Sequence, residues 1–163
     1  MREFITSGGA QTLSNGTTTL VFLNPAAAPN FNIAILRHWV GFTANATSAQ
    51  VPVRLFTQVT AFPSLVAATP AKVKRADPNV SILVGSTTGA AGTSGINATT
   101  DGAGTQTTVL DDAFNVLNGW LNVPTPDEIL VMPAGSTSGY GMRLSTAPST
   151  LTSWHFGTTF GER

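Results

Sequence analysis

The sequence lacks cysteine altogether, which excludes disulfides, thiolate nucleophiles and cysteine-based metal sites. It is also poor in charge, because only 10% of its residues are charged, against about 25% in an average soluble domain. The eight basic and eight acidic residues cancel. A nucleic-acid binder needs a positive field to displace counterions, so we expect no nucleic-acid partner. No run of 18 consecutive apolar residues is present, so we also expect no membrane partner.

Low charge has a second consequence, which concerns association. Soluble monomers usually keep their net charge away from zero, because near-neutral surfaces tend to associate. Here a formal net charge of zero accompanies a hydrophobic content of 42%. One interpretation is a protein whose surface is largely covered by protein partners. The other is a threonine-rich soluble domain that happens to be neutral.

Short apolar or alternating segments, separated by turn residues, run along the whole chain. The 163 residues fit one domain, and glycine and proline are scattered so evenly that few stretches have room for a helix of ordinary length. We therefore predict a single all-β domain over residues 1–163, a jelly-roll β-sandwich with little or no helix. The predicted strands are Thr17–Leu23, closed by a turn over Asn24–Pro29, and then Asn32–Thr43, Val51–Thr60, Val80–Val84, Thr105–Leu110, Glu128–Met132, Tyr140–Ser145 and Ser153–Phe160.

The segment Asn32–Thr43 is the strongest apolar run, and it is apolar on both of the faces that strict alternation assigns to it. A strand of this kind is either buried twice, once in its own sandwich and once under a second subunit, or is a central strand with one side chain out of pattern. One face carries Ile33, Ile35, Arg37 and Trp39, and the other carries Ala34, Leu36, Val40 and Phe42.

The next segment, Val51–Thr60, alternates more regularly. Val51, Val53, Leu55 and Val59 share one face. Phe56 lies on the other face with Arg54, where an aromatic residue is either an ordinary exposed side chain or an anchor in a subunit contact.

Three segments do not fit the strand pattern. Val109–Leu121 spaces its leucines as a helix would, but Gly119 and Pro124 favour a turn followed by a strand. Gly85–Gly104 is rich in glycine and threonine, and we expect a long loop that contributes little to the core. Residues 1–11 carry the apolar pair Phe4–Ile5 before a flexible Gly8–Gly9, which indicates either an N-terminal arm on a neighbouring protein or a frayed end.

Candidate catalytic groups are few. His38 and His155 each lie in an apolar segment, which favours an outward-facing or internally bonded histidine over a catalytic one. The pairs Asp111–Asp112 and Asp127–Glu128 lie beside turns, and adjacent residues of a strand point to opposite faces. We expect no enzyme activity, no cofactor and no metal site.

Several short motifs occur in an order that is similar to a known family. They are Ile35–Val40 (ILRHWV), Val51–Gln58 (VPVRLFTQ), Thr69–Val73 (TPAKV), Asp77–Pro78, Asp127–Val131 (DEILV), Gly141–Pro148 (GMRLSTAP) and an aromatic final strand that ends in Glu162. In this order they resemble the small decoration, or cement, proteins that tailed phages place on assembled icosahedral heads. The segments Gly85–Gly104 and Phe114–Trp120 depart from that pattern.

The resemblance implies a trimeric jelly roll of the tumour-necrosis-factor type with no catalytic residues. Its implied partners are two further copies of the chain and the major capsid protein, on the outer capsid surface of a virion assembled in the host cytoplasm. The alternative is a trimeric head-fibre or receptor-binding module for glycans, for which Tyr140 and Trp120 are the candidate sugar-stacking residues. The residues that we expect at a subunit or capsid interface are Phe4, Ile5, Arg37, Trp39, Arg54 and Phe56.

Overall fold

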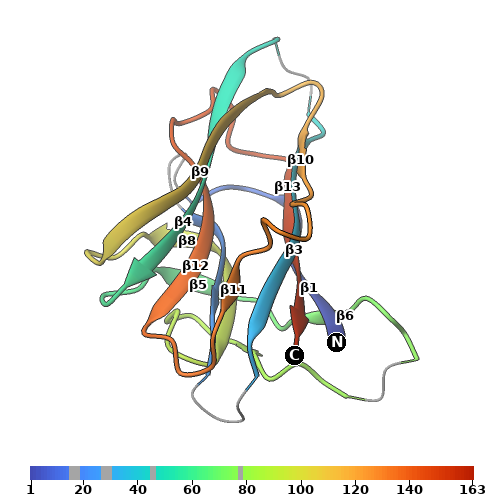
Figure 1. Cartoon of the computed structure of the whole chain (residues 1–163). Coiled ribbons are helices and arrows are strands. Elements are labelled where there is room, and N and C mark those ends of the chain that lie inside the picture. Colours follow the sequence, from blue (N-terminus) through green and yellow to red (C-terminus); the bar gives the residue numbers. More distant parts are fainter. Residues whose placement is uncertain (15–18, 27–30, 45–46, 77–78) are drawn as a thin grey trace.

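A computed structural model describes residues 1–14, 19–26, 31–44, 47–76 and 79–163. All regular structure in these ranges is β-strand, and two sheets pack face to face (Figure 1). The all-β prediction is confirmed, and the arrangement is a β-sandwich consistent with a jelly roll. Asp77–Pro78 and part of the predicted turn Asn24–Pro29 lie outside the described residues, as does the start of the predicted strand Thr17–Leu23.

The first sheet is built around a long central strand from the end of the chain. Its order is β10-β3-β13-β1-β6, and β11 also pairs with β3. The bounds are β10 Trp120–Asn122, β3 Ile33–Phe42, β13 Trp154–Glu162, β1 Arg2–Gln11, β6 Ala71–Lys72 and β11 Val131–Met132.

The second sheet has the order β5-β8-β2-β12-β4-β9, with β7 paired in parallel to β8. Strands β9 and β10 therefore form edges of the two sheets. The bounds are β5 Ser64–Ala67, β8 Thr93–Thr100, β2 Thr19–Asn24, β12 Ser138–Leu144, β4 Gln50–Val59, β9 Thr105–Asn115 and β7 Val84–Gly85.

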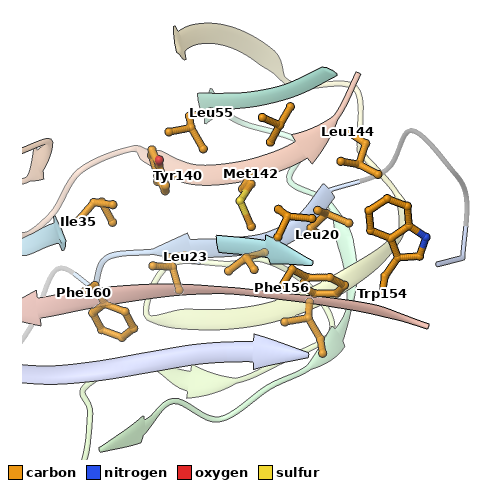
Figure 2. Close-up of a cluster of buried hydrophobic side chains, with 14 of the residues drawn as sticks. Leu20, Leu23, Ile35, Leu55, Tyr140, Met142, Leu144, Trp154, Phe156 and Phe160 are labelled. Atoms are coloured by element: carbon orange, nitrogen blue, oxygen red, sulfur yellow. The ribbon is translucent and has the colours of Figure 1, made fainter. Parts of the chain in front are cut away.

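The main core fills the space between the sheets (Figure 2). Alternate residues of β13 supply Trp154, Phe156 and Phe160, all at most 1% exposed. Side chains such as Leu23 and Met142 meet them from the second sheet. The alternation of apolar side chains that predicted the final strand is thus the alternation that builds the core.

A smaller cluster lies on the other face of the second sheet, and it contains Phe56. Phe22, Phe56, Leu65 and Ala98 are buried there, with Phe62 beside them. The Phe56 ring lies over Gly141, where a Cβ would clash with it, so the missing side chain makes room for the ring. The expectation that Phe56 anchors a subunit contact is wrong, because this fully buried ring fills its own chain's interior.

A β-bulge explains why β3 is apolar on both predicted faces. Arg37 pairs with Thr159 and Ile35 with Phe160, so Leu36 is an extra residue opposite β13. A bulge of this kind reverses the alternation. Ile35 before the bulge and His38 and Val40 after it are therefore all buried. Double burial under a second subunit is not needed to explain the pattern.

The N-terminal segment is a core strand, so the prediction of an arm or a frayed end over residues 1–11 is wrong. β1 pairs with β13 from Arg2↔Glu162 to Gly8↔Phe156. Phe4 is fully buried against Phe160, with ring centroids 6.0 Å apart. Residues 6–10 of β1 are threonine, serine, glycine and alanine, so the segment does not show the alternation of large apolar side chains that is typical of a core strand. Its pairing with β13, at the other end of the chain, cannot be read from the local sequence.

The end of β1 is fixed by an ion pair. Arg2 lies 2.9 Å from the Glu162 carboxylate, whose side chain is fully buried. The same carboxylate accepts hydrogen bonds from the Ser81 hydroxyl and from the backbone N–H of Ile82. These contacts tie the start of the chain, its end and the segment before β7 together.

The predicted loop Gly85–Gly104 contains strand β8, so the expectation that it contributes little to the core is also wrong. Residues Thr93–Ala98 are buried, and β8 pairs with both β2 and β5. Small side chains permit close packing, since a Cβ at Gly95 would lie 2.7 Å from that of Leu65. Hydrogen bonds from the Asn97 amide to Thr12 and from Thr19 to the Asp101 carboxylate fix the segment further.

Other boundaries differ from the prediction in smaller ways. The helix considered for Val109–Leu121 is absent from the structure, where β9 extends to Asn115 and a turn leads to β10. Most of the predicted strand Val80–Val84 is irregular, although Leu83 is buried in the core. Strands β5 and β6 are short, and the sequence did not predict them.

Candidate functional site

Three of the six predicted interface residues lie together on the outer face of the first sheet. We define this outer face by Ile5, Arg37, Trp39 and Leu121, which point away from the core. Their register places Leu121 beside Trp39 and places Arg37 and Ile5 on either side of Thr159. The Trp39 indole lies flat over Gly157, where a Cβ would be 2.8 Å from its Nε1 atom. Leu121 remains 64% exposed, so the outer face presents apolar surface to its surroundings.

The other three predicted residues lie elsewhere. Phe4 and Phe56 are interior residues, as described above. Arg54 lies on the second sheet, where its guanidinium is 2.8 Å from the Asp111 carboxylate in an exposed ion pair. The structure therefore does not form one site from all six residues. Leu121 was not among the predicted residues, because its exposure depends on the turn that precedes β10.

A buried polar network joins the two sheets. The Tyr140 hydroxyl on β12 lies 2.8 Å from His38 Nε2 on β3, and His38 Nδ1 lies 3.1 Å from the Thr158 hydroxyl on β13. The Trp120 ring stacks on the His38 ring at a centroid distance of 6.3 Å, and its Nε1 donates to Asp112. His38 is thus an internally bonded core histidine. His155 is bonded nearer the surface, to Ala10 N–H and the Thr43 hydroxyl.

Burial sets the protonation state of this network. Loss of solvation lowers the pKa of His38 from 6.5 to about 3 and raises the pKa of Tyr140 well above 10. Both side chains are therefore neutral at pH 7. They hold the two sheets together by hydrogen bonding.

The shifted histidine predicts a specific acid sensitivity. The unfolded chain binds the His38 proton with a pKa near 6.5 and the folded chain with a pKa of about 3, so stability falls as the pH is lowered between these values. From pH 7 to pH 5 this group alone is expected to cost about 2 kcal/mol of the free energy of unfolding. Urea unfolding at both pH values measures the loss.

One variant isolates the contribution of His38. His38→Phe is expected to be less stable at pH 7, because it leaves the Tyr140 and Thr158 hydroxyls unpaired, but to lose about 2 kcal/mol less between pH 7 and pH 5. An equal pH dependence in His38→Phe and in the wild type would contradict a neutral buried His38.

A cavity of about 310 Å³ opens beside this network. Ile35 and His38 of the first sheet line it, together with Leu55 of the second sheet, Tyr140 and residues of the connection from β10 to β11. Figure 2 shows Ile35, Leu55 and Tyr140 around the same end of the core. Most residues of this lining are apolar and come from segments far apart in the sequence, so only the fold reveals the cavity.

The residues considered for sugar stacking are poorly placed for it. Tyr140 is 2% exposed and its hydroxyl is bonded to His38. Trp120 is partly buried, and its indole is fixed between His38 and Asp112. Neither ring presents an open face beside free polar groups, as stacking against a glycan requires.

The acidic residues are separately bonded. Asp111 pairs with Arg54, and the Trp120 and Ala113 hydrogen bonds lower the pKa of Asp112. Hydrogen bonds from Thr125 likewise lower the pKa of Glu128. Over the described ranges, no three His, Asp or Glu side chains gather closely enough to hold a metal ion. The same ranges contain no helix able to cross a membrane.

Comparisons with protein-family models, curated proteins and solved structures found no match to this chain.

Proposed function

We propose that this protein is a structural virion protein, a homotrimer that binds the outer surface of an icosahedral capsid and stabilises the contacts between capsomers. The observation that carries this proposal is the outer face of the first sheet. There Ile5, Arg37, Trp39 and Leu121 lie near one another on a sheet surface that the chain itself leaves partly uncovered. Aromatic residues and arginine are the side chains most enriched at protein interfaces.

The charge distribution supports a protein partner. A net charge of zero gives two copies of the chain no long-range repulsion, and a charge content of 10% leaves the surface weakly hydrated. The order of motifs that resembles phage decoration proteins supports the same class of partner. A glycan-binding module is the weaker alternative, because Tyr140 is buried and Trp120 is fixed in the His38 network.

The proposed self-association predicts the mass of the protein in solution. Light scattering coupled to size exclusion should report about three times the chain mass of 16.9 kDa at micromolar concentration. Leu121→Asp should weaken association at least 100-fold, because placing a carboxylate in an apolar contact costs several kcal/mol, about tenfold for every 1.4 kcal/mol. Trp39→Asp should weaken either the trimer or the fold.

A matched variant controls for a general effect of added charge. Val80 is 76% exposed and lies outside the outer face, so Val80→Asp should leave the mass unchanged. Circular dichroism confirms that each variant is folded. A wild-type protein that is monomeric at micromolar concentration, or a Leu121→Asp variant that associates like Val80→Asp, would contradict the proposed interface.

Binding to a shell tests the proposed function itself. Purified protein should co-sediment with expanded, undecorated heads and should not select a ligand on a glycan array. Binding should depend weakly on salt, because exposed charges are scarce. Recognition of a glycan without binding to heads would instead favour the receptor-binding alternative.

A further inference from the structure

We propose that the cavity beside His38 and Tyr140 is a binding site for a small neutral molecule with an apolar body and one hydroxyl group. The site is independent of the outer face, because it opens between the two sheets at the edge formed by β9 and β10. The connection from β10 to β11 closes one side, and in Figure 1 it runs as an orange segment along the sandwich.

Two bulges build the cavity. Ile35 and His38 are three residues apart, so a regular strand would turn them to opposite faces, but the bulge at Leu36 brings both to the lining. Val109 is an extra residue opposite β4, since Leu55 pairs with Leu110 and Phe56 with Thr108. Val109 and its neighbour Leu110 therefore both line the cavity. Bulges are over-represented next to active sites, where they redirect side chains.

The size of the cavity selects the size of its ligand. A dry cavity of about 150 Å³ accepts benzene, and ligand pockets begin at about 300 Å³. At about 310 Å³, this cavity has room for two fused rings or a branched chain of similar volume. Core residues otherwise pack closely, so an opening of this size beside a buried polar pair is a distinct feature of the fold.

The chemistry of the lining selects the kind of ligand. The walls are largely aliphatic, including Leu55, Val123 and Leu130, and the polar lining residues are His38, Asn122, Glu128 and Tyr140. The Tyr140 side chain is buried at the inner end of these walls, beside His38. A phenol hydroxyl has one donor and two acceptor positions, and the hydrogen bond with His38 uses one of these three. A ligand hydroxyl can occupy another.

Anions are disfavoured in this cavity. Among the described residues that line it there is no lysine or arginine, whereas the acidic residue Glu128 is present. The neutral state of His38 at pH 7 leaves that side of the cavity without a positive charge as well. A carboxylate or phosphate would therefore lose its hydration without gaining a cation.

A pair of probes of equal shape tests the proposal. At pH 7, 2-naphthol should bind at least tenfold more tightly than 2-naphthoate, as measured by ligand-observed NMR titration. Val123 is 60% exposed at the cavity, so Val123→Trp should fill it without removing core packing and should weaken 2-naphthol binding at least tenfold. Tyr140→Phe should weaken 2-naphthol binding about three- to tenfold by removing the hydroxyl.

Leu117→Trp provides the matched control, because Leu117 is similarly exposed but lies outside the lining. Its affinity for 2-naphthol should stay within twofold of the wild type. The proposal is overturned if 2-naphthol does not bind at millimolar concentration, if 2-naphthoate binds equally well, or if Val123→Trp and Leu117→Trp bind alike. Melting temperatures of all three variants establish that each is folded.

Discussion

Phe4→Ala is expected to destabilise the protein by about 3–5 kcal/mol, a large part of the stability of a domain of this size. Phe4 is fully buried and packs on Phe160, so the substitution leaves a cavity between β1 and β13 in the main core. Denaturant unfolding followed by tryptophan fluorescence measures the loss.

Ile5→Ala is the matched control for Phe4→Ala. Ile5 is the next residue along β1, but it points to the outer face and is only partly buried. Its truncation should cost about 1 kcal/mol, below the range for a fully buried isoleucine. Equal and small effects of the two substitutions would show that β1 does not belong to the core.

Replacing Ser86–Ala103 by a short Gly-Ser linker is expected to abolish cooperative folding. The replacement removes β8, which lies between β2 and β5, together with the Asp101 carboxylate that accepts hydrogen bonds from Thr19. It would also expose Phe22 and Leu65 of the smaller cluster. In a thermal melt monitored by near-UV circular dichroism, the variant should lack the sharp, cooperative transition of the wild type.

Single substitutions in β8 make the same test less drastic. Ile96→Ala should cost about 2–4 kcal/mol, because Ile96 is in the main core, whereas Thr99→Ala in an exposed position should cost less than about 1 kcal/mol. If the linker variant melts within a few degrees of the wild type, the segment is a dispensable loop after all.

The sequence predicted strands well where apolar side chains alternate. β4, β12 and β13 lie close to their predicted ranges. In these strands one face is buried, so apolar residues recur at every second position of the sequence. β1 and β8 were missed, since their buried positions include Thr6, Ser94 and Gly95. Residues this small pack closely in a sheet, but in a sequence they are typical of loops.

The candidate site was predicted only in part, for a related reason. Of the six residues expected at an interface, Ile5, Arg37 and Trp39 lie together on the outer face, although alternation alone placed Arg37 and Trp39 beside Ile35, which is buried. The bulge at Leu36 separates them, and a bulge depends on pairing with a strand more than 100 residues away. The His38–Tyr140 network and the cavity depend on contacts between sheets, which no local pattern records.

The proposed binding of this β-sandwich to a capsid should stabilise the shell, and the thermal stability of the shell tests this most directly. Differential scanning calorimetry should compare undecorated heads alone with heads saturated by the wild-type protein. Because many copies bind the intact shell and not its dissociated subunits, we expect the melting temperature of the shell to rise with occupancy. Leu121→Asp should reduce the rise, and Val80→Asp should not. An unchanged melting temperature at saturating occupancy would contradict a stabilising role.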